Sequence, residues 1–218
     1  MRRTIFLAVL LALGSLGLCG QARADQLYLS NVGNNFYYGV FAGPYTAQMS
    51  DGSTIPIVCD DFNTTVTQGW TWTATSINFS DPTFLKDVKF GQSASLTGYS
   101  QMINYFAAAY LAQEIMANLS NTAMVDQLSF ALWGIFSSSA RLEWLMDPQA
   151  RKDYLAALAY AQNANASDFA NVEFWVPSPT GSSQEYITIL ATPEPSKWVL
   201  LLCGALLLVV IKIKHLLV

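Results

Sequence analysis

Histidine is almost absent from this chain of 218 residues, which contains only His215. The region from Asp25 to Thr192 has none, so it can hold neither a Ser-His-Asp triad nor a histidine-based zinc site. It also lacks a glycine-rich phosphate-binding loop. We therefore expect no cofactor, no metal site and no enzymatic activity.

Cysteine is nearly as scarce. Cys19 and Cys203 lie in the two strongly apolar ends of the chain, which leaves Cys59 alone in the region between them. A single cysteine cannot form an internal disulfide, so the stability of this region must come from its core.

Basic side chains are the third shortage. Between Asp25 and Thr192, fourteen aspartates and glutamates stand against five lysines and arginines. Such a surface repels the phosphates of nucleic acids, which excludes nucleic acid as an expected partner. Solubility outside the cell is the simplest interpretation of this charge.

The N-terminus has the three parts of a secretory signal peptide. Arg2 and Arg3 precede an apolar run, 5–18, and small residues flank Arg23 just before Asp25. A lipoprotein signal and a twin-arginine signal fit less well, because Leu18 precedes Cys19 and the residues around the arginine pair differ from the twin-arginine pattern. We expect a signal peptide at 1–24 and one exported domain at 25–192.

The C-terminus predicts a membrane anchor. The segment from Trp198 to Ile211 is uncharged and almost wholly apolar, and as a helix it would be about 21 Å long. Continuing to Val218 gives enough length to span the membrane, with Lys212 and Lys214 reaching toward the interface. A buried core helix at the end of a soluble domain is the alternative.

The same tail resembles the sorting signal of bacterial PEP-CTERM proteins. Pro193, Glu194 and Pro195 precede the apolar helix, and basic residues follow it. The resemblance implies processing near this tripeptide by a membrane peptidase, exosortase. It also implies export through the inner membrane to the surface of a Gram-negative cell, often one with an extracellular polysaccharide matrix. The family usually ends in arginines, whereas this chain has two lysines and a histidine.

The exported region is expected to be α+β. Its N-terminal half is rich in β-branched and aromatic residues, which predicts antiparallel strands, and Asp51-Gly52 predicts a hairpin. A helical periodicity follows, with Asp147 as the N-cap of the third helix. A closing β-hairpin completes the domain. The expected strands are 26–32, 36–41, 45–49, 54–59, 70–79, 172–176 and 185–190, and the helices are 100–118, 122–136 and 148–163.

The middle of the chain loosely resembles the thioester domain of bacterial surface adhesins. Cys59 ends a predicted strand, and Trp133 lies on a predicted helix. In that family the cysteine bonds to a glutamine four residues before the helical tryptophan, and the thioester acylates an amine on a host or partner surface. Ser129 stands in that position here, and Gln127 would face elsewhere on the helix. The resemblance therefore implies a related scaffold that lacks the cross-link, with Cys59 as a small buried residue.

Other constellations are weaker. Asp60 and Asp61 beside Cys59 would raise the pKa of its thiol, and as a pair they could bind Ca²⁺ or simply cap a turn. Trp70 and Trp72 should share one face of a strand, either stacking on sugar rings or packing into the core. Carboxylates for glycosidase chemistry are also available in principle, such as Glu114 with Asp126 and Asp60 with Glu143.

Together these patterns predict an exported structural or interaction protein, at the cell surface or in the matrix, whose partners are the membrane and an exosortase. An extracellular polysaccharide or another surface protein is a further expected partner. A thioester-type adhesin and a carbohydrate-binding module remain as alternatives.

Overall fold

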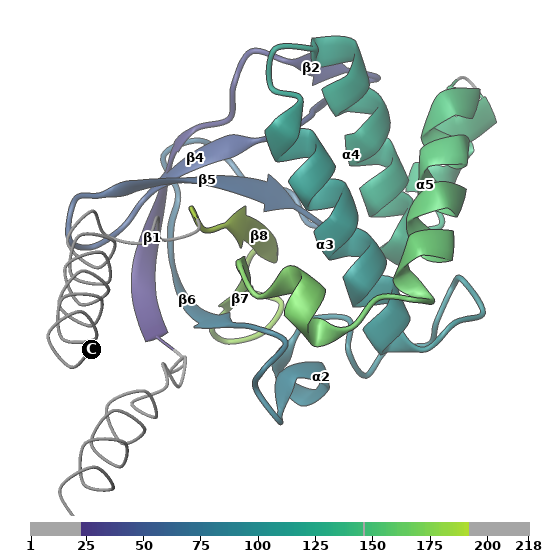
Figure 1. Cartoon of the computed structure of the whole chain (residues 1–218). Coiled ribbons are helices and arrows are strands. Elements are labelled where there is room, and N and C mark those ends of the chain that lie inside the picture. The colour runs from purple at the N-terminus through teal and green to yellow at the C-terminus, as the bar shows by residue number, and fades with distance from the viewer. Residues whose placement is uncertain (1–22, 146, 192–218) are drawn as a thin grey trace, which may run out of the picture.

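The computed structural model describes residues 23–145 and 147–191 (Figure 1). The sorting motif Pro193-Glu194-Pro195 and the predicted anchor, Trp198 to Ile211 with Lys212 and Lys214, lie outside the described residues, as does most of the predicted signal peptide. Within the described ranges, no helix has the length and apolar character needed to cross a membrane. These terminal signals therefore stay predictions from the sequence.

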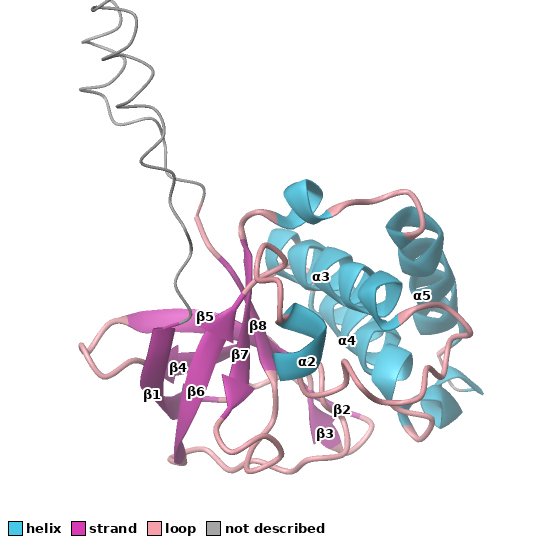
Figure 2. Ribbon diagram, turned by 90° about the horizontal axis from the view of Figure 1, so that it is seen from below, coloured by secondary structure: helices cyan, strands magenta, loops and turns pink. Residues whose placement is uncertain are grey.

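Six antiparallel strands form a closed barrel (Figures 1 and 2). Their order around the barrel is β1-β4-β5-β8-β7-β6, so each strand has a hydrogen-bonded neighbour on both sides. Closure leaves no unpaired sheet edge in the barrel. The strands are β1 (Arg23–Asn31), β4 (Tyr45–Gln48), β5 (Thr54–Cys59), β6 (Thr71–Ile77), β7 (Val172–Pro177) and β8 (Tyr186–Ile189).

The last two strands complete the barrel. β7 pairs with β6, β8 pairs with β5, and the two pair with each other as the predicted closing hairpin. The β7–β8 hairpin, near the end of the described residues, thus lies between β5 and β6, which do not pair with each other. The α+β prediction is confirmed, while closure into a barrel was not foreseen.

Strand β1 begins before the predicted signal cleavage site. Arg23 pairs with Ser76 and Ala24 with Thr75 at the β1–β6 edge. After cleavage before Asp25, four of the pairs in this register would remain, Asp25 to Tyr28 against Ala74 to Thr71.

The prediction of one strand over 36–41 was wrong. Two short strands, β2 (Phe36–Tyr37) and β3 (Val40–Phe41), pair as a tight hairpin outside the barrel. Tyr38 and Gly39 between them have φ values of 44° and 83°, which turn the chain back on itself. The hairpin expected at Asp51-Gly52 is confirmed, since β4 and β5 pair across it and Gly52 has a φ of 84°.

The helices form one layer beside the barrel (Figure 2). α3 (Gln101–Ala117) contacts β8, while α4 (Thr122–Phe136) and α5 (Pro148–Ala161) pack against α3 and each other. All three helices were predicted, and the Asp147 side chain caps α5 by accepting from the backbone N–H groups of Gln149 and Ala150. The sequence missed α2 (Phe84–Asp87) and the 3₁₀ turns η1 (Ala140–Leu145) and η2 (Ala166–Phe169).

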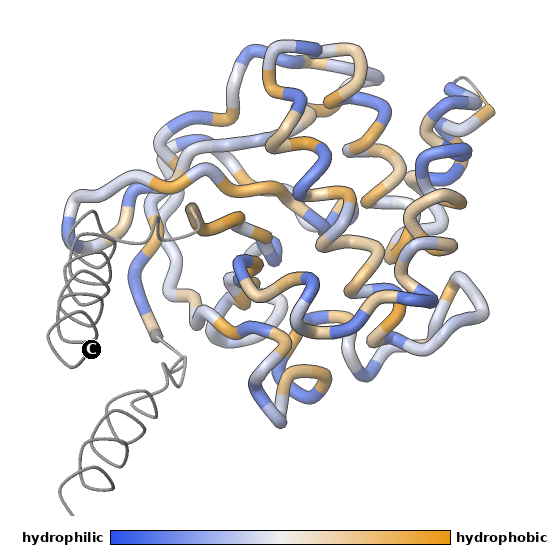
Figure 3. Tube along the Cα trace, in the orientation of Figure 1, coloured by the Kyte–Doolittle hydropathy of each residue, from blue (hydrophilic) through white to orange (hydrophobic). Residues whose placement is uncertain are grey.

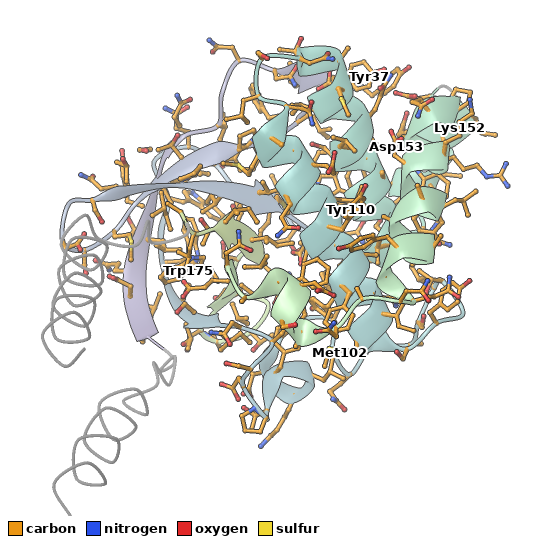
Figure 4. All side chains as sticks on the ribbon, in the orientation of Figure 1. Tyr37, Met102, Tyr110, Lys152, Asp153 and Trp175 are labelled. Carbon is orange, nitrogen blue, oxygen red and sulfur yellow. The ribbon has the colours of Figure 1, made fainter. Side chains whose placement is uncertain are left out.

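The molecule has two apolar cores. One lies between the barrel and the helices, where Tyr105 of α3 meets Phe174 of β7 with ring centroids 5.3 Å apart. At the margin of this core, the partly buried Tyr110 of α3, labelled in Figure 4, stacks on Tyr160 of α5. The other fills the barrel and includes Trp175, also labelled in Figure 4, and Cys59. In Figure 3, hydrophobic residues are prominent along β5, whose last three residues are all buried.

The two tryptophans predicted to share a face differ in burial. Trp72 lies in β6 and packs in the barrel core, whereas Trp70 precedes the strand and is 49% exposed. One ring is therefore in the core and the other meets solvent, so the two do not form one exposed row.

Candidate functional site

The site is built around Cys59, the last residue of β5. Its side chain is buried in the barrel core, and its Cα is paired with that of Tyr186 on β8. The thiol donates to the Asp61 carbonyl oxygen, 3.2 Å away, and its sulfur accepts from the Asp61 N–H. A local turn therefore fixes the direction of the sulfur.

The tryptophan helix meets this strand end, as the resemblance predicted. Trp133 of α4 is buried and donates its indole N–H to the Cys59 carbonyl oxygen at 2.8 Å. Ser129, in the position of the expected glutamine, instead donates its hydroxyl to Val125 one turn back along the helix. The helix thus positions the cysteine and offers it no acyl group from that position.

A different glutamine shares a hydrogen-bond acceptor with the cysteine. Gln184 immediately precedes Glu185 and β8, and it is buried. Its amide nitrogen donates to the Asp61 carbonyl oxygen at 3.0 Å and to the Thr64 carbonyl oxygen, while its amide oxygen accepts from the Tyr186 hydroxyl. The Cys59 thiol and the Gln184 carboxamide therefore share one backbone oxygen as their hydrogen-bond acceptor.

The sequence did not single out Gln184, because the family resemblance places the glutamine on the tryptophan helix. The signal that could have identified Gln184 is its position next to a strand: it comes just before the closing strand, and Cys59 is the last residue of an earlier strand. That signal becomes useful only once β5 and β8 are known to pair.

A pocket of about 340 Å³ lies beside Gln184. Asp61 and Gln184 form part of its lining, and the β2–β3 hairpin contributes Phe36 and Phe41, which are 61% and 42% exposed. The remaining aromatic lining consists of Tyr45, Phe62 and Trp133. Gln184 therefore lies in the wall of a pocket that five aromatic side chains also line.

The thiol itself is not activated. Burial raises the pKa of Cys59 well above its usual value, and the charges of Asp60 and Asp61 raise it further, which confirms the direction expected from the sequence. A buried, protonated thiol reacts poorly with reagents in solution. Any chemistry at Cys59 must therefore involve a group that the fold holds beside it.

A buried carboxyl pair lies behind the strand ends. Asp60 and Glu185 are both 0% exposed, and they interact with each other. Burial raises the pKa of both groups, and for Asp60 the charge of Glu185 adds to this. Glu185 also accepts from the Tyr105 hydroxyl at 2.8 Å and from the Lys89 N–H at 2.7 Å. The pair therefore retains a proton when ordinary carboxyls have lost theirs.

The other carboxylate pairings are not supported. Asp60 faces Glu185 and not Glu143, while Asp126 accepts from the Asn35 amide. Asp61 forms an ion pair with Lys89. In the described part of the chain, no group of three or more His, Cys, Asp or Glu side chains is arranged to hold a metal ion.

Comparison with known proteins gives two solved structures. No family model matches the sequence, and no curated protein matches it. Both structures are of the pilus-presented adhesin Spy0125 (Cpa), one of them a cysteine-to-alanine mutant. Their TM-scores are 0.46 and 0.47, with 12% and 14% identity over 79% and 80% of this chain. The chain spans 66% and 49% of their lengths, and similarity at this level identifies neither its family nor its activity.

Proposed function

We propose that this chain is an exported surface protein that forms an internal thioester between Cys59 and Gln184 and uses it to attach covalently to an amine on a partner. The observation that carries the proposal is the Asp61 carbonyl oxygen, which accepts hydrogen bonds from both the Cys59 thiol and the Gln184 carboxamide. The pocket beside Gln184 supports access for a partner side chain.

The proposed chemistry is an acyl exchange with no oxidant. The Cys59 sulfur attacks the Gln184 side-chain carbonyl carbon, the carbon–nitrogen bond breaks, and ammonia leaves with the thiol proton. A primary amine then attacks the same carbon, which forms an amide and returns the thiol. The chain acts once and is consumed, so the proposal includes no enzymatic turnover.

The experiment is a mass measurement on the full-length chain in detergent. We expect the protein to weigh one ammonia less than its sequence requires, and peptic digestion at acidic pH should yield a Cys59 peptide linked to a Gln184 peptide. Methylamine should add its own mass at Gln184 and release a thiol that iodoacetamide can alkylate after unfolding. A full, unshifted mass together with no methylamine addition would refute the thioester.

Location and processing form a separate part of the proposal, supported by the terminal sequence patterns. We expect a mature surface form that begins near Asp25 and ends near Pro193, Glu194 and Pro195. Alanine at Pro193 and Pro195 should leave a longer, membrane-held form. Cell fractionation with mass spectrometry of both chain ends tests this, and an intact, soluble, cytoplasmic chain would contradict it.

A carbohydrate-binding module is not proposed. Its candidate stacking row was Trp70 with Trp72, and Trp72 is buried inside the barrel. The pair therefore cannot present two rings to one sugar chain.

A further inference from the structure

One lysine connects the two segments that carry the proposed reacting groups. The Lys89 ammonium contacts the Asp61 carboxylate, the Thr64 hydroxyl and the Ser183 carbonyl oxygen. Asp61 and Thr64 follow Cys59 in the chain, and Ser183 directly precedes Gln184. A single side chain thus joins the cysteine segment to the glutamine segment.

The main chain of Lys89 adds a fourth contact. Its N–H donates to the Glu185 carboxylate at 2.7 Å, on the other side of Gln184 from Ser183. Gln184 therefore lies between two residues that Lys89 holds. On the cysteine side, the other oxygen of Asp61 accepts from the N–H groups of Asn63 and Thr64, which fixes the turn that Lys89 contacts.

The fold holds Lys89 firmly in this position. It follows α2, whose Phe84 is buried, and the chain turns so tightly here that a Cβ on Gly91 would lie 2.1 Å from the Leu85 carbonyl oxygen. The next residue, Phe90, stacks on Phe136 of α4, and its N–H donates to the Tyr105 hydroxyl. The lysine is therefore anchored on both sides by the core.

We propose that Lys89 is a positioning residue, which holds the Cys59 sulfur and the Gln184 carboxamide at reacting distance. This inference rests on the proposed thioester. Bond formation between two such groups is sensitive to displacements of about 1 Å, which can cost on the order of a hundredfold in rate. The Lys89–Asp61 pair suits this role, because its side chains are only 14% and 2% exposed and are shielded from competing water.

The test compares Lys89→Met with Lys86→Met, which removes an exposed lysine of α2 from the same segment. Since Lys89→Met leaves the Asp61 carboxylate buried without its cation, the double variant Lys89→Met/Asp61→Asn is made as well, with both charges removed. Ile115→Ala serves as a destabilised core control that leaves these contacts in place. Thermal unfolding of each full-length protein establishes that it is folded.

Two readouts are taken from folded protein. The first is the fraction of molecules lacking one ammonia, which should fall about tenfold or more in both Lys89 variants and stay at the wild-type level in Lys86→Met and Ile115→Ala. The second is the rate at which iodoacetamide alkylates any free Cys59 thiol in the native state. This rate should rise about tenfold when the two segments separate.

The outcomes separate the two proposals. If the wild-type protein has its full mass, the thioester proposal is refuted. The alkylation rates alone then test whether Lys89 holds the two segments together. Unchanged ammonia loss or unchanged alkylation in a folded Lys89 variant overturns the positioning role. If the fraction of molecules lacking ammonia falls equally in Ile115→Ala, the positioning role is also overturned, because the effect would then result from reduced stability.

Discussion

Replacing Gln184 by alanine is expected to abolish the loss of ammonia and reduce methylamine capture to background. The variant removes the only carboxamide seen to share a hydrogen-bond acceptor with the Cys59 thiol in the described part of the chain. Cys59→Ala should have the same effect, because either change removes one half of the proposed bond. Intact-mass spectrometry before and after methylamine treatment measures both.

Gln127→Ala is the matched control. Gln127 lies on α4, close in sequence to the position where the family resemblance placed the glutamine, and its loss should leave the mass deficit intact. Alanine at Gln184 removes buried hydrogen bonds, so a loss of stability of about 1–3 kcal/mol is also expected and is measured separately by denaturant unfolding. A mass deficit that survives Gln184→Ala but disappears in Gln127→Ala would assign the bond to the helix instead.

Asp60→Asn is expected to stabilise the protein at neutral pH and to flatten its dependence on pH. The folded-state pKa of Asp60 is raised above the unfolded value, so the folded protein keeps a proton that the unfolded chain releases. Stability is therefore full at acidic pH, below the unfolded pKa, and is lost as pH rises toward the folded pKa. Between the unfolded and the folded pKa, the free energy of unfolding should fall by about 1.4 kcal/mol for each pH unit.

Asparagine keeps the shape of the side chain and can donate to Glu185 without carrying a proton that titrates. Urea unfolding of both proteins from acidic to neutral pH gives the difference directly. Asp81→Asn is the control, because Thr83 hydrogen bonds lower the pKa of that partly exposed carboxyl. Its effect on stability should appear only as the pH falls through the acidic range. A wild-type and an Asp60→Asn curve that run parallel would show that the buried pair does not retain the extra proton.

Local patterns predicted most of the individual elements. Thr54–Cys59 and Thr122–Phe136 have the bounds expected from alternation and helical periodicity, and the Asp147 cap forms as predicted. These features depend on residues within one or two turns of each other, so the sequence contains the information. The prediction for 36–41 failed at Tyr38, a tyrosine with positive φ that no turn preference indicates.

The candidate site was only half predictable. Cys59 and its contact with the tryptophan helix were foreseen from a resemblance, whereas Gln184 and Lys89 were not selected by any pattern. Neither residue lies near Cys59 in sequence. Their relevance depends on β8 pairing with β5 and on the bond from the Lys89 N–H to Glu185, which are long-range contacts.

By itself, the sequence determined the alternation of strands and helices, the shortage of histidine and cysteine, and the apolar ends that predict export and anchoring. These follow from side-chain chemistry and short spacings. Only the tertiary structure decided that the strands close into a barrel and that Gln184, not a glutamine of α4, shares a hydrogen-bond acceptor with the Cys59 thiol. The reason is that β8 enters between β5 and β7, and this pairing of distant segments is selected by burial in two shared cores and not by any local preference.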